Sequence, residues 1–90
     1  MTTYVAAPGV AWTLDTDEWD LPRVFVAPLP HGPISVLPVE SALIWLAAVE
    51  GVRDVVAEVA RLAGEPVETV RGDVEAVLGQ LVAQGLLARR

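Results

Sequence analysis

The 90-residue sequence contains no cysteine and only one histidine, His31. Without cysteine there are no disulfides, no thiolate metal sites and no thiol catalysis. His31 lies in a loop rich in proline and glycine, with no carboxylate beside it in the sequence. Hydrolytic or transfer chemistry needs a nucleophile with a base within reach, or a metal. We therefore predict that the chain is not an enzyme, has no catalytic residues and uses no cofactor.

Lysine is also absent, and acids outnumber arginines. Lysine and arginine together number 6, all of them arginine, against 12 acidic residues, so the formal net charge is -6. The excess of acids is divided between the two halves of the chain, and no stretch gathers arginines. Proteins that bind nucleic acids draw most of their affinity from basic side chains that meet phosphates. Nucleic acid is therefore not an expected partner.

Long apolar runs are missing as well, although 53% of the residues are hydrophobic. The longest uninterrupted run, Ala42 to Val49, is too short to cross a bilayer. Residues 1–10 have neither the basic start nor the apolar core of a signal peptide. We expect a cytoplasmic protein with no membrane partner, whose many apolar residues fill a small core and leave some apolar surface for a partner.

The length predicts a single domain over residues 1–90, with residues 1–9 as an N-terminal extension. Three short segments have the alternation and the β-branched residues of strands, at 10–14, 23–27 and 34–37. Short loops rich in turn residues join them, which favours an antiparallel meander.

After Pro38 the apolar spacing changes to that of helices. Three helices are expected, over about 39–49, 52–63 and 66–84, and each ends close to a glycine. The second is expected to place one apolar stripe toward the core, formed by Val52, Val55, Val56, Val59 and Leu62. After the third, Leu86 and Leu87 are expected to fold back onto the core. The expected fold class is α+β and winged-helix-like, with an N-terminal three-stranded antiparallel sheet packed on three C-terminal helices.

Asp15 to Asp20 form an acidic loop between the first two expected strands. Its carboxylates invite a calcium interpretation, but the loop lacks the glycine and the distal glutamate of an EF-hand. A solvated turn without metal is therefore preferred. Of the three tryptophans, Trp45 is predicted to be core and Trp12 half-buried on the sheet. Trp19, within the acidic loop, has no assigned role.

The third expected strand is the candidate binding element. Prolines bracket it, and no charged residue lies between His31 and Glu40. Edge strands are usually protected by charges or bulges, and this strand has only its short length and its prolines. An open edge of this kind accepts an extended peptide as an additional strand.

The third helix is expected to flank that edge with an apolar stripe. Arg71 and Glu75 at its margin either pair with charged peptide side chains or form a plain surface ion pair. The stripe itself is either a groove wall or ordinary core. If the stripe is a groove wall, Val74→Glu should weaken peptide binding more than it lowers the stability of the domain. The candidate peptide-binding residues are Pro33, Ile34, Ser35, Val36, Val67, Val70, Arg71, Val74, Glu75 and Leu78.

Four segments resemble the PqqD-like family of recognition elements for ribosomally made, modified peptides, and one of them is Val67 with Asp73 and Val74. Leu37 to Trp45 is similar to the start of that family's first helix, although Pro38 stands where the family usually has an N-cap side chain. Val52 to Val59 is similar to the short second helix. Leu78 to Leu87 is similar to the closing leucine-rich helix that ends in Gly-Leu-Leu.

The resemblance implies a non-catalytic protein that binds the leader of a precursor peptide between its third strand and third helix. At the positions of this sequence that match the family's leader-binding strand and helix, the resemblance implies the contact residues Ile34, Ser35, Val36, Val67, Val70, Arg71, Val74 and Leu78. A free-standing chain of this size suits a lasso-peptide system, in which it works with a leader peptidase and a cyclase or another modifying enzyme. Pyrroloquinoline quinone and mycofactocin systems use the same arrangement.

Two other functions stay open at this point. The helical half also suits a winged-helix DNA-binding regulator, against which the acidic composition argues. The open edge also suits a small module that associates with itself.

Overall fold

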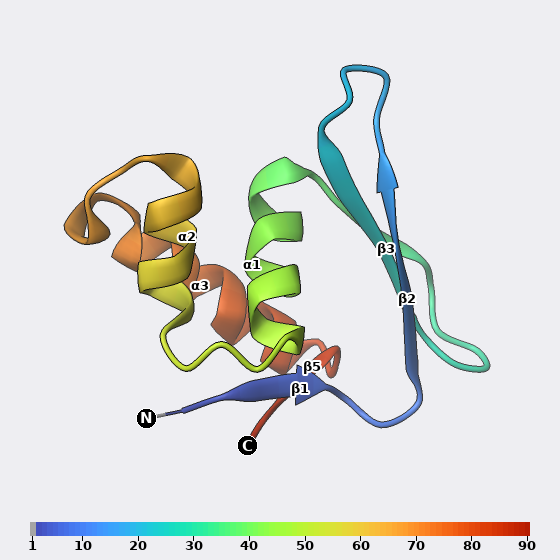
Figure 1. Cartoon of the computed structure of the whole chain (residues 1–90). Coiled ribbons are helices and arrows are strands. Elements are labelled where there is room, and N and C mark those ends of the chain that lie inside the picture. The colour runs from blue at the N-terminus through green and yellow to red at the C-terminus, as the bar shows by residue number, and fades with distance from the viewer. Residues whose placement is uncertain (1) are drawn as a thin grey trace.

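The computed structural model describes residues 2–90, and the predicted α+β class is confirmed (Figure 1). A three-stranded antiparallel sheet is followed by three helices, and a two-stranded sheet joins the ends of the chain. The elements are β1 (Tyr4–Ala6), β2 (Val10–Thr16), β3 (Pro22–Pro28), β4 (Ser35–Leu37), α1 (Val39–Val49), α2 (Val55–Ala63), α3 (Val67–Ala83) and β5 (Leu87–Arg89).

The larger sheet has the strand order β2-β3-β4, as the meander prediction requires. β2 and β3 form a long hairpin in which Trp12 pairs with Val26, and β4 adds through the pair Val26 and Ser35. The turn end of the hairpin stands clear of the helices (Figure 1). Among residues 2–90, β4 pairs with β3 alone, so it forms one edge of the sheet.

α1 packs against one face of this sheet and forms the centre of the core. Val24 and Val26 of β3 are buried, and so is Trp45 of α1. Side chains in a strand alternate between faces, so Phe25, between these two valines, points away from the helices. The predicted start of α1 is confirmed: Pro38 is the N-cap without a side-chain bond, and its carbonyl accepts the N–H of Ala42 at 2.8 Å.

α2 begins three residues later than predicted, at Val55. The cause is Asp54, whose carboxylate accepts the backbone N–H of Ala57 at 3.0 Å and caps the first turn. Val52 therefore precedes the helix, and it packs against the core from the loop. Leu62, expected on the buried stripe, is 48% exposed.

α3 covers Val67–Ala83, close to the predicted 66–84. Its expected apolar face is confirmed, because Val74, Leu78 and Leu81 are buried, and other members of the stripe pack partly buried against the core. None of the helices within residues 2–90 is both long enough and apolar enough to cross a membrane.

The chain ends form a second sheet that the sequence did not predict. Residues 1–9 were expected to be an extension, yet Tyr4–Ala6 pair with Leu87–Arg89 as antiparallel strands. Met1, the first residue of that extension, lies outside the described residues. Leu86 and Leu87 are buried, in agreement with their predicted return to the core.

Candidate functional site

The outer edge of β4 carries exposed apolar side chains and no charge. Ile34 is 72% exposed and Val36 is 53% exposed, whereas Leu37 is buried. Pro33 is exposed and Ser35 is partly buried. Large apolar side chains beside an unpaired strand edge are unusual in a small protein, because such edges invite pairing with another chain.

The turn between β3 and β4 contains Gly32 and leads the chain into this edge. The Gly32 N–H donates to the carbonyl of Pro28 at 2.8 Å. A Cβ atom at position 32 would lie 2.5 Å from that carbonyl oxygen and would overlap the Pro28 ring. Only glycine fits this close approach, so the path from β3 to β4 depends on it.

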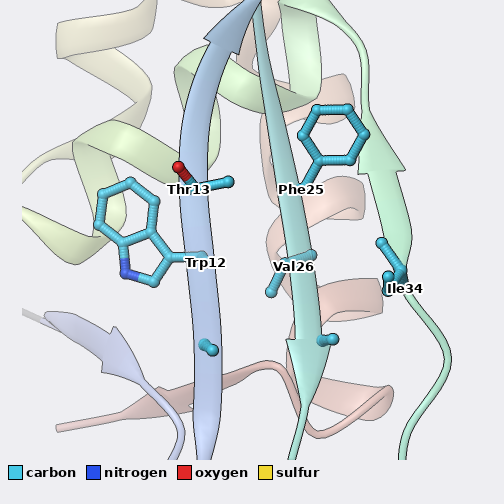
Figure 2. Close-up of a pocket in the computed structure, with 7 residues that line it drawn as sticks. Trp12, Thr13, Phe25, Val26 and Ile34 are labelled. Carbon is cyan, nitrogen blue, oxygen red and sulfur yellow. The ribbon is translucent and has the colours of Figure 1, made fainter.

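On the side of the sheet away from the helices, the edge adjoins a shallow apolar pocket of about 230 Å³. Phe25 stands in register with Val36 on one side and with Thr13 on the other. The ring of Phe25 and the side chain of Ile34 lean into the space between β3 and β4, and Trp12 extends to the other side of β2 (Figure 2). The pocket is lined by Ala11, Trp12, Thr13, Phe25, Val26, Ala27 and Ile34.

Arg23 stacks over the ring of Phe25, one of the residues that line this pocket. Its guanidinium lies 5.2 Å from the centroid of the Phe25 ring and 3.1 Å from the carboxylate of Asp15 on the neighbouring strand. A cation over an aromatic face is attractive. The backbone N–H of Thr16 and the Arg23 guanidinium together lower the pKa of Asp15 below its ordinary value of 3.8.

On the other side, the edge adjoins a second pocket, of about 320 Å³. Pro33 and Ser35 line it from the β4 side, and Gln84 and Leu86 line it from the end of α3. Ser35 and Val36 therefore reach different sides of the sheet, as neighbours in a strand do. The edge of β4 has a recess on each side.

Four predicted residues of α3 do not line either recess. Val74, only 2% exposed, and Leu78 are buried in the core, and Val67 packs against that core. Val70 and Val74 border a separate pocket between the three helices, together with Ile44 of α1. The stripe is therefore core, which was one of the two interpretations of its spacing.

Arg71 and Glu75 lie elsewhere, facing the N-terminal strand. They line a pocket of about 310 Å³ with Tyr4 and Arg53. An ion pair between Arg71 and Glu75, one of the two interpretations of their spacing, is not among the ion pairs of residues 2–90. Arg71 instead approaches Glu68, with 3.5 Å between Nη2 and Oε1. The structure thus brings Pro33 to Val36 together and separates them from the N-terminal half of α3.

Sequence reasoning missed the residues that complete the two recesses, which are Phe25, Pro28, Gln84 and Leu86. Phe25 carried a usable signal, because in a strand with Val24 and Val26 inside it must face outward. Gln84 carried none, since its position depends on how the end of α3 packs.

Comparisons with protein-family models, with curated proteins and with solved structures found no match to this chain. The site is therefore interpreted from its own geometry. Among residues 2–90, no three histidine or carboxylate side chains gather in a group that could hold a metal ion.

Proposed function

We propose that the chain is a non-catalytic, cytoplasmic binding protein that captures the leader of a ribosomally synthesised precursor peptide. It would deliver the leader to a modifying enzyme or a leader peptidase, in lasso-peptide or related biosynthesis. One observation carries the proposal: the edge of β4 is unpaired and uncharged, and it is flanked by exposed Ile34 and Val36.

In this mechanism the leader adds to β4 as a fourth strand. Main-chain hydrogen bonds to the free edge provide docking, and alternate side chains of the peptide point to opposite sides of the sheet. One set meets the recess at Phe25 and Ile34, and the other meets the recess at Ser35 and Gln84. Selectivity then comes from two or three apolar side chains of the leader.

Binding of this kind orders a segment that was disordered, which costs several kcal/mol of the gross interaction energy. The anchor side chains must therefore be well buried in the two recesses. The benefit is local concentration, because a tethered precursor meets the partner enzyme far more often than a free one.

Fluorescence polarisation tests the proposal. The probes are labelled leader peptides from short open reading frames beside the gene, at moderate salt. We expect saturable binding of one leader and its loss in Val36→Glu. Leu62→Glu is the matched control, because Leu62 is also an exposed apolar residue but lies on α2, away from the edge; it should bind as wild type does.

Leader peptides that carry a single backbone N-methyl group at successive positions distinguish strand addition from binding through side chains alone. Each backbone N-methyl group removes one donor, so binding should fall at every second position. Uniform tolerance of N-methylation would exclude strand addition. Absence of leader binding, together with a concentration-dependent dimer in light scattering, would assign the edge to self-association instead. Binding of unrelated duplex DNA at low salt would favour a DNA-binding regulator.

A further inference from the structure

The turn end of the β2–β3 hairpin carries exposed apolar side chains that neither recess uses. We define residues 14–21 as the hairpin tip. Trp19 is 74% exposed, and Leu14 and Leu21 are also exposed. A tryptophan has a large apolar surface, and one left in water on a projecting turn contributes little to the core.

The backbone of the hairpin tip is nonetheless held in one conformation. The carboxylate of Asp17 accepts the N–H groups of Trp19 and Leu21, at 2.8 and 3.0 Å. The N–H of Asp17 donates to the carbonyl of Leu21 at 2.9 Å, and the N–H of Asp20 donates to the carbonyl of Asp17 at 3.0 Å. Asp20 adopts a positive φ of 64° to close the turn. Four hydrogen bonds thus fix the segment that presents Trp19.

Two of the four acidic residues of the hairpin tip interact within the chain, and the other two are exposed without an ion-pair partner among the described residues. Asp15 is paired with Arg23, and Asp17 accepts the hydrogen bonds of the turn. Glu18 and Asp20, on either side of Trp19, form no ion pair with any residue of the described chain (2–90). The exposed Trp19 is therefore preceded and followed in the sequence by exposed acidic residues whose charges are not used within the described chain.

We propose that the hairpin tip docks a partner protein that presents arginine or lysine side chains around an apolar pocket, which takes the Trp19 indole. Charge complementarity selects this occupant, since Glu18 and Asp20 attract basic side chains and repel phosphate backbones and anionic lipids. Tryptophan is enriched among residues that dominate binding energy at interfaces. A turn already held in one conformation by its own hydrogen bonds loses little entropy on binding.

This surface is separate from the edge of β4. Leu37, the last residue of β4, stands opposite Val24, and the pairs of Asp15 with Arg23 and Thr16 with Pro22 lie beyond it toward the turn. The hairpin tip and the two recesses have no lining residue in common. The inference therefore does not depend on the identity of the peptide at the edge.

Site-specific photo-crosslinking in cells of the source organism tests the inference. Trp19 is replaced by the photoreactive residue p-benzoylphenylalanine, which keeps an aromatic group, and Leu62 on α2 receives the same replacement as a matched exposed control. We expect one protein to be crosslinked from position 19 and not from position 62. Mass spectrometry should place the crosslink in a segment rich in lysine or arginine.

The identified partner is then purified and titrated with the intact chain. We expect Trp19→Ala to weaken its binding by about 30-fold, the size of a typical dominant interface residue. The double variant Glu18→Gln, Asp20→Asn removes both charges and keeps a side chain that tolerates the positive φ at position 20. It should also weaken binding, and added salt should weaken wild type more than the double variant. Urea unfolding of each variant, unchanged from wild type, separates loss of docking from loss of fold.

Three results would overturn the inference. One is equal crosslinking from positions 19 and 62. Another is a purified partner that binds Trp19→Ala and the double variant as tightly as wild type. The third is a crosslink to nucleic acid, or binding of the wild-type chain but not Trp19→Ala to vesicles of phosphatidylcholine with or without phosphatidylglycerol. Leader binding at β4 is measured alongside, so that failure of the proposed function is seen separately.

Discussion

The rings of Trp12 and Trp45 meet edge to face, with 6.0 Å between their centroids and an angle of 71° between their planes. Trp45 lies fully buried in α1, and Trp12 is 39% exposed on β2. The pair attaches the outer strand of the hairpin to the central helix. This arrangement confirms the expectation that Trp45 belongs to the core and that Trp12 is partly buried on the sheet.

Replacement of Trp12 should loosen the hairpin from α1. We expect Trp12→Ala to lower the free energy of unfolding by about 2 kcal/mol, from lost burial and the lost aromatic pair. Trp19→Ala should change it by less than about 0.5 kcal/mol, because the Trp19 side chain is exposed. Urea unfolding followed by far-ultraviolet circular dichroism measures both. Equal losses in the two variants would contradict the structural difference between these tryptophans.

Val74→Glu should unfold the domain. The spacing of α3 had suggested a groove wall, for which this change would reduce peptide binding more than stability. The burial of Val74 reverses that expectation, since a carboxylate at this position has no partner and loses its water. We expect a loss of more than about 4 kcal/mol, measured by thermal unfolding. Ala76→Glu, an exposed position on the same helix, should leave the melting temperature nearly unchanged.

Gly32→Ala and Gly72→Ala should have opposite effects on stability. An alanine methyl at position 32 overlaps the backbone of Pro28, so we expect a loss of about 1–3 kcal/mol and a displaced β4. At position 72, in α3, the methyl meets nothing, and alanine should stabilise the helix by about 0.5–1 kcal/mol. Urea unfolding gives both values. Amide exchange at Ser35 and Val36 should rise only in Gly32→Ala.

The pH dependence of Asp15 should report the contacts on the β2–β3 hairpin. Its pKa is lowered by the Thr16 N–H and by Arg23, so its contribution to stability is present above the ordinary value of 3.8. That contribution is lost as the pH falls through the lower pKa of the folded state. Carboxyl NMR should show a titration midpoint below 3.8 in wild type and a higher one in Arg23→Gln. An unchanged midpoint in that variant would leave no role for Arg23.

The order and class of the elements could be predicted because their signals are local. Pro38 and Gly51 bracket α1, and both of its bounds were predicted correctly. The start of α2 was wrong because Val52 continues the apolar spacing, although Asp54 gave a capping signal one residue before the helix. β1 was missed because three residues carry little pattern and their partner strand lies at the far end of the chain.

Only part of the candidate site could be predicted, because only that part has a local signal in the sequence. The edge of β4 follows from prolines and missing charges, which are visible in the sequence. Which neighbour a helix face meets is a property of the packed structure, and the spacing of Val74 and Leu78 is the same whether they face a core or a groove. The recess formed with Gln84 depends on contacts between residues about fifty positions apart, which one sequence does not reveal.

The pairing of β1 with β5 has a consequence for the connectivity of the chain. Tyr4 stands opposite Arg89, and the N–H of Arg90 donates to the carbonyl of Thr3 at 2.8 Å, so the two ends lie side by side (Figure 1). A short glycine linker should join them, and the backbone could then be reopened between α2 and α3, at Gly64. Such a circular permutant keeps every contact of β4 and of the hairpin tip while it changes the order in which they are synthesised.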